Sequence, residues 1–199
     1  MEAFKHGRGT DEEYIEKCKK NFEKHVITIE HECSKVKRYR FSEDGTWCFG
    51  MNITCANNMI SVNGDCGTLM IEPGYGRCGL AFMLDCCTNT GYFLGKQPYG
   101  MGWGDIYMEY DADYAKHLIL EHLIDYLELE QEEIDEKMED VYGLDDGSLL
   151  GMSKYYEWCY ENDVEEPCSP TIIESSVLNM LAGLHCFIEQ YNKMTSREV

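Results

Sequence analysis

The residues whose types suggest metal-dependent chemistry lie close together in the middle of the chain: His117, Glu121 and His122. Two histidines that bind one zinc ion from a single helix stand four residues apart, because only that spacing puts both rings on one face. Here the two histidines stand five residues apart. The sequence therefore predicts surface histidines on a helix and no metal site at this position.

The eleven cysteines are a second candidate source of chemistry. Zinc-binding pairs have the C-x-x-C spacing, whereas the closest cysteines here are Cys86–Cys87 and the pair Cys48 and Cys55. The first ten residues are polar and lack the apolar core of an export signal. Free thiols in a reducing compartment are therefore expected. Cys–His nucleophile pairs form in space, and no local sequence signature marks one here.

Glycines recur through residues 95–104, where a phosphate-binding loop would need a G-x-x-x-x-G-K-[ST] or strand–G-x-G-x-x-G–helix context. Neither pattern is present, so the sequence predicts an irregular loop, and no catalytic residue, metal or cofactor is assigned anywhere in the chain. Trp103 and Tyr107 stand in or beside this loop. They are candidate anchors of a protein interface, with core packing as the alternative.

An acidic helix face is the strongest functional signal. A helix is predicted from Asp111 to about Val141, and carboxylates recur along it at spacings of three or four residues, about 5–6 Å apart on one face. That spacing is close to the spacing of phosphates along a nucleic-acid strand. The alternative is an ordinary solvated helix face. The residues assigned to this face are Glu121, Asp125, Glu128, Glu132, Glu136, Glu139 and Asp140.

The net charge of −20 is concentrated in one third of the chain: residues 105–168 hold twenty-one Asp/Glu and three Lys/Arg. Solubility requires far less charge than this, and like charges on one surface repel each other. The excess predicts a basic protein partner and argues against direct contact with DNA or RNA phosphates. No stretch approaches the roughly 20 apolar residues of a membrane span. The oligomeric state is left open.

The hydrophobic patterns predict an α+β protein with a single domain over residues 1–199. An N-terminal helix capped by Thr10 or Asp11 precedes five short strands, whose alternating residues and turn signals predict an antiparallel meander. Asn63-Gly64-Asp65 is expected to supply the positive-φ residues of the last hairpin. Residues 1–104 form the helix-plus-sheet part and residues 105–199 an acidic helical part. The strands are expected at 26–30, 36–41, 47–55, 59–62 and 66–71, and further helices at 80–87 and 171–192.

Residues 25–71, about a quarter of the chain, resemble a group of uncharacterised phage and prophage proteins. The resemblance rests on a β-meander that ends in a Gly-Asp-x-Gly-Thr hairpin, here Gly64-Asp65-Cys66-Gly67-Thr68. It implies a phage origin and an α+β scaffold and carries no known chemistry. By class alone, a small acidic phage protein without a catalytic motif is similar to anti-CRISPR and anti-restriction inhibitors, several of which place carboxylates where a nuclease expects phosphates.

Together these observations predict a non-enzymatic, phage-encoded inhibitor in the cytoplasm of a bacterial host. Its expected partner is a basic nucleic-acid-binding host protein, such as a CRISPR-Cas effector nuclease, held through the acidic, phosphate-mimicking face. The alternative is a phage accessory or regulatory protein whose acidic surface only maintains solubility.

Overall fold

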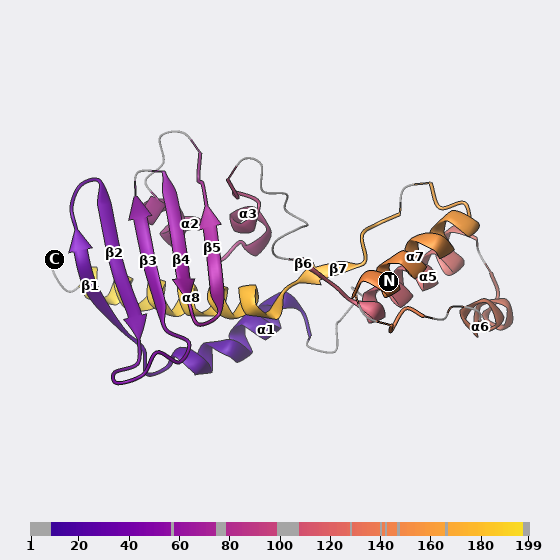
Figure 1. Ribbon diagram of the computed structural model, residues 1–199, viewed down its shortest axis with the longest axis horizontal. Helices are drawn as coiled ribbons and strands as arrows, with labels where there is room; N and C mark the ends of the chain where they lie inside the picture. Colours follow the sequence, from indigo (N-terminus) through magenta and orange to yellow (C-terminus); the bar gives the residue numbers. More distant parts are fainter. Residues whose placement is uncertain are drawn as a thin grey trace. The chain divides into compact units, whose positions relative to one another are not determined.

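The computed structural model describes residues 9–56, 58–74, 79–98, 108–127, 129–139, 141, 143–146, 148–165 and 167–196. It confirms the α+β fold, with a five-stranded antiparallel sheet and an N-terminal helix. The sequence predicted one domain, and the chain divides into two compact units. We call the unit that contains the described residues of 108–173 the acidic unit, and the unit that contains the described residues of 10–98 and 174–196 the sheet unit; their elements are labelled in Figure 1.

The sheet unit contains the predicted meander, with five strands in sequence order and every neighbour antiparallel. Side chains that alternate along each strand place Tyr39, Phe41 and Ile53 on the buried face and Arg40, Asn52 and Thr54 on the opposite face. The strands are β1 (Val26–Glu32), β2 (Val36–Ser42), β3 (Met51–Ala56), β4 (Met59–Gly64) and β5 (Gly67–Ile71).

The third strand begins later than the expected residue 47. Trp47 to Gly50 form a tight turn instead, in which the Gly50 N–H donates to the Trp47 carbonyl at 2.7 Å. Phe49 adopts a φ of 55°, and its N–H donates to the Asp65 carboxylate at 3.1 Å. Residues 47–50 were expected to begin the third strand. They form a turn instead, which contacts with the distant Asp65 hold in place.

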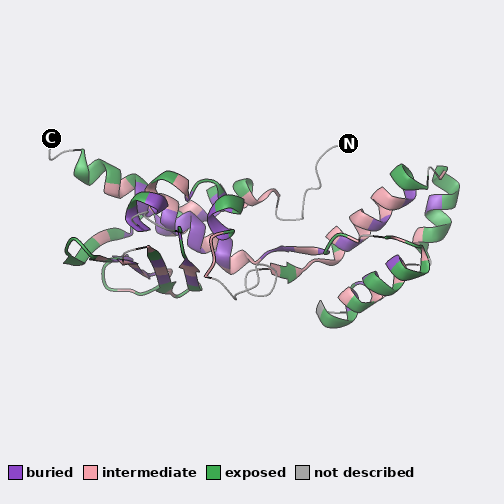
Figure 2. Ribbon diagram, turned by 90° about the horizontal axis from the view of Figure 1, so that it is seen from above, coloured by how far each residue is buried: buried purple, intermediate pink, exposed green. Residues whose placement is uncertain are grey.

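Helices cover one face of the sheet, as Figures 1 and 2 show. α8 (Ser175–Thr195) is the longest, and its buried residues include Leu181, Leu184 and Phe187. Phe187 packs on Tyr39 and Phe41 with ring centroids 5.3 and 5.9 Å apart. The other helices in the described part of this unit are α1 (Asp11–Cys18), a 3₁₀ turn (Lys19–Phe22), α2 (Gly79–Cys86) and α3 (Thr90–Leu94).

The grouping of α8 with the acidic helical part was wrong, since α8 belongs to the sheet unit. Its buried side chains complete the core under the sheet, a pairing between the two ends of the chain that no local pattern encodes. The helix also begins at Ser175 and not at residue 171, because residues 171–173 form a strand. The predicted helix at residues 80–87 is confirmed as α2.

Thr10 begins α1 as predicted. The Glu13 N–H donates to Thr10 Oγ1 at 3.2 Å, and the Thr10 N–H donates to Glu13 Oε2 at 3.0 Å. This reciprocal capping box satisfies two main-chain donors that the first helical turn leaves without partners.

The described residues of the acidic unit form two short strands, three α-helices and a π-helical turn, and this architecture differs most from the prediction. The continuous helix expected from Asp111 to about Val141 is wrong, and the helix at Ser148–Glu161 was not predicted. The elements are β6 (Met108–Tyr110), α5 (Ala112–Glu121), a π-helical turn (His122–Tyr126), α6 (Gln131–Glu139), α7 (Ser148–Glu161) and β7 (Thr171–Ile173), with β6 and β7 antiparallel. Among the helices that the structure describes, none combines the length and apolar character of a membrane span.

Candidate partner-binding surface

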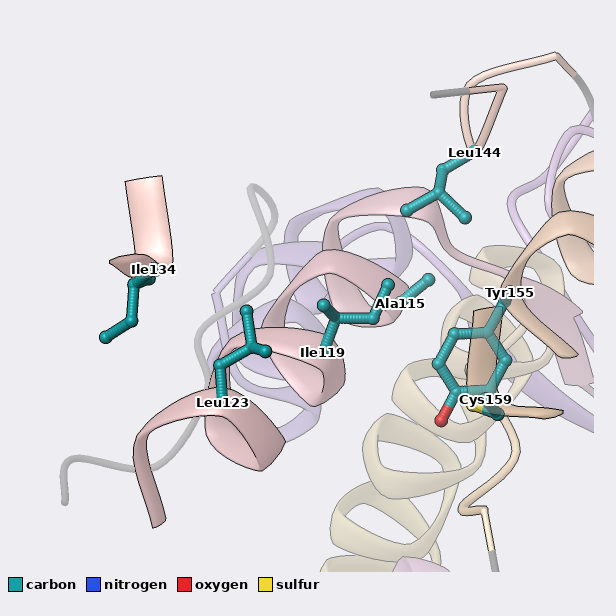
Figure 3. Packing of buried hydrophobic residues seen from close by; sticks show 7 residues of the cluster. All are labelled: Ala115, Ile119, Leu123, Ile134, Leu144, Tyr155 and Cys159. Carbon is teal, nitrogen blue, oxygen red and sulfur yellow. The ribbon is translucent and has the colours of Figure 1, made fainter. Parts of the chain in front are cut away.

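A small apolar core holds the helices of the acidic unit together (Figure 3). α5 supplies Ala115 and Ile119 and the π-helical turn supplies Leu123, all fully buried, and α7 supplies Tyr155 and Cys159. Ile124 and Leu127, in and just after the π-helical turn, are exposed and lie outside this core. α6 reaches this core mainly through the buried Ile134, with Met138 packed beside it.

The expected acidic face is divided because the helix ends after Tyr126. The Leu127 N–H donates to the His122 carbonyl at 3.1 Å and the Leu129 N–H to the Leu123 carbonyl at 3.2 Å. A new helix then begins, and the Glu130 N–H donates to Glu133 Oε2 at 3.2 Å. Carboxylates expected in one straight row therefore lie on separate elements.

Glu121 is the last residue of α5, and Asp125 lies in the π-helical turn that follows it. Glu121 is 3.3 Å from His117 Nε2, which gives one of its oxygens a partner. Both acids, together with His122 and Tyr155, line a hollow of about 300 Å³. The aromatic and aliphatic wall and the two carboxylates at its rim suit the stem and cationic head of a Lys or Arg side chain.

Glu132, Glu136 and Glu139 lie on α6, and all three are exposed. Glu133 and Asp135, which the sequence analysis did not assign to the face, are exposed as well. These five carboxylates cover a broad arc of α6 opposite its buried Ile134, and we call this arc the α6 acidic face. Their spacing on either side of Ile134 could have indicated the arc, since residues three or four apart share a helix face.

Four of the predicted interface residues cannot be assigned to the hollow or to the α6 acidic face. Glu128, Asp140, Trp103 and Tyr107 lie outside the described residues.

Few cations balance these acids. Lys116 Nζ is 2.8 Å from Asp145, and Lys154 Nζ is 2.6 Å from Glu157, so each of these lysines already neutralises a carboxylate away from α6. Lys137 is the basic residue in the last turn of α6. The α6 acidic face therefore presents five carboxylates with one lysine among them, a surface that attracts cationic groups.

The histidines that suggested metal chemistry have separate surroundings. His117 stacks near Tyr114 and pairs with Glu121, whereas the His122 ring stacks on Tyr126 at 4.9 Å and meets Trp158 edge-on at 5.9 Å. Within the described ranges, no group of three or more His, Cys, Asp or Glu side chains is placed to hold a metal ion.

No protein-family model matches the chain, and no curated protein or solved structure matches it either. The resemblance to phage proteins stays a prediction from the sequence. A function is therefore inferred from the surface of the acidic unit.

Proposed function

We propose that this protein is a non-catalytic, phage-encoded inhibitor that acts in the cytoplasm of a bacterial host. Its target is a nucleic-acid-targeting defence complex, with a CRISPR-Cas effector nuclease as the specific candidate. The acidic unit binds the basic surface on which the effector holds DNA. The observation that carries this proposal is the α6 acidic face, where five exposed carboxylates accompany one lysine.

The physical basis is electrostatic. Effector nucleases of this class hold their nucleic acids in positively charged channels. A dense cluster of carboxylates is attracted to such a channel over about one Debye length and accelerates association. Because the helix breaks after Tyr126, the acids are not a straight copy of a phosphate row. The mimicry therefore rests on charge density and not on a repeated spacing.

Exposed pairs contribute little individually, so binding depends on their number. The hollow beside Glu121 and Asp125 adds a place for one desolvated cationic side chain, where a single pair is worth more than at an exposed site. A surface that served only for solubility would require neither feature.

A cleavage assay with purified effector nucleases tests the proposal. The protein should slow cleavage of a target duplex in a dose-dependent way, and excess DNA added before the protein should relieve the inhibition. Failure to slow any of a panel of effectors, or inhibition that DNA does not relieve, would contradict it.

A further inference from the structure

α7 carries the two most exposed large apolar side chains in the described part of the acidic unit. Leu149 keeps 87% and Tyr160 86% of its surface in contact with solvent. An isolated exposed leucine needs no explanation, but a contiguous exposed apolar surface marks an interaction site.

These residues lie on one face of α7, where the exposed Ser153 stands between Leu149 and Tyr156. With about 3.6 residues per turn, Leu149, Tyr156 and Tyr160 fall within an arc of about 40° and extend roughly 16 Å along the axis. Tyr156 is 39% exposed, and its ring is fixed edge-on against the buried Tyr155 with centroids 5.3 Å apart. We call these three residues the apolar stripe.

The opposite side of α7 already has its partners. Tyr155 and Cys159 are buried in the core of the unit. A side chain added at Gly151 would meet the Tyr110 ring, whose hydroxyl donates to the Leu144 carbonyl at 2.9 Å. α7 is therefore held by one face, and the apolar stripe is not part of the packing that holds the unit together.

Acidic residues flank the stripe at both ends. Glu161, Asp163 and Glu165 follow Tyr160 and are exposed, and Asp145 and Asp146 precede the helix. Apolar anchors within a charged rim are the usual arrangement of a protein interface, in which tyrosine is over-represented. The charge of the rim decides between occupants, since a second copy of this chain would bring the same acids against it and be repelled.

We infer that the apolar stripe is the docking site for a basic amphipathic helix of the partner. Its apolar side chains pack on Leu149, Tyr156 and Tyr160, and its Lys and Arg side chains meet the acidic rim. This inference rests on the proposed function and adds to it the type of segment that the acidic unit recognises.

Two labelled synthetic peptides test the inference, one of Lys and Leu and one of Lys and Ala, with the same length, charge and amphipathic helical pattern. The full-length protein should bind the Lys/Leu peptide at least about tenfold more tightly. The double variant L149A/Y160A should lose that preference and bind both peptides equally. Alanine is a good helix former, so α7 should stay folded. The control M194A removes an exposed apolar side chain of α8 and should keep the preference.

The outcomes separate the two proposals. Equal binding of both peptides by the wild type, or an unchanged preference in L149A/Y160A, would overturn the docking site and leave the acidic surface in place. Failure of both peptides to bind at low salt would contradict the proposed function and the inference together. A wild-type dimer that becomes monomeric in L149A/Y160A would assign the stripe to a second copy and overturn the inference alone.

Discussion

The main-chain N–H of Leu127 donates to the carbonyl of His122, five residues earlier, at 3.1 Å. This bond closes a π-helical turn and ends the first acidic helix. The consequence reaches beyond the turn, because the carboxylates of Glu121 and Asp125 beside it are separated from those of α6. The candidate partner-binding surface therefore consists of a hollow and an acidic arc, in place of one acidic row.

Gly64 should be intolerant of any side chain, because a Cβ there would collide with the Gly50 carbonyl oxygen. The predicted positive φ at Gly64 was wrong; the residue with that conformation is Gly67, at φ 119°. Gly64→Ala should lower the free energy of unfolding by about 2 kcal/mol or more, since the rigid main chain must shift. Chemical denaturation measures this change.

Gly91→Ala is the matched control for that experiment, because an added Cβ at Gly91 meets no atom within 4 Å. Its stability should equal or slightly exceed that of the wild type. If Gly64→Ala were as stable as Gly91→Ala, the close approach of β4 to the Trp47–Gly50 turn would be contradicted.

His25 should make stability depend on pH. It is 2% exposed, lies 5.1 Å from the Phe22 ring and 5.2 Å from the Phe41 ring, and neither ring nitrogen has a hydrogen-bond partner of standard geometry among the described residues. Burial lowers the pKa of His25 below its usual 6.5, although the nearby carbonyls of Phe49 and Cys48 oppose the shift. The folded state therefore disfavours the charged form of this side chain relative to the unfolded chain.

The unfolded chain binds a proton at His25 first as the pH falls, so stability is greatest above the unfolded pKa of about 6.5 and declines below it. His25→Leu should remove this contribution. Its free energy of unfolding should therefore fall less than that of the wild type when the pH is lowered from about 8 to about 5.5. Burial also lowers the pKa of His185, which adds the same slope to both proteins. His31→Leu, at an exposed position, is the control. Equal slopes in His25→Leu and the wild type would refute the assignment.

Cys33 should be the first exposed thiol to react with an alkylating reagent. The main-chain N–H of Lys35 and, next, the side chain of His31 lower the pKa of its thiol, and the thiolate is the reactive form. Cys48 is also exposed and serves as the comparison, whereas Cys87 is buried, which raises its pKa. Peptide mass spectrometry over a time course at neutral pH measures the order. Faster modification of Cys48 than of Cys33 would contradict this prediction.

Local signals explain what the sequence predicted correctly. The meander follows from alternating residues between turn-forming segments, and the start of α1 follows from Thr10 and Glu13, which cap each other. These are interactions between near neighbours, and their residue types are sufficient to indicate them.

The errors concern long-range packing. Nothing near residues 175–195 indicates that this helix completes the core under the sheet. In the acidic unit, Leu123 from the π-helical turn and Ile134 from α6 enter one core from either side of the break after Tyr126. Helical periodicity continues across that break in the sequence, so it predicted one helix. Three of the five acids of the α6 acidic face were therefore identified from the sequence, but Glu133, Asp135 and the arrangement of the acids were not.

The central claim, that the α6 acidic face binds a basic effector, is tested most directly by one cleavage titration. The triple variant E132Q/E136Q/E139Q removes three exposed carboxylates, and E23Q/D44N/D85N removes three exposed carboxylates from the sheet unit. Their total charges are equal, and helix α6 should hold or gain stability as repulsion falls. For an effector that the wild type inhibits, the concentration for half-maximal inhibition should rise at least about tenfold with the α6 variant and little with the control, at about 0.05 M salt. Equal inhibition by all three proteins would contradict the claim.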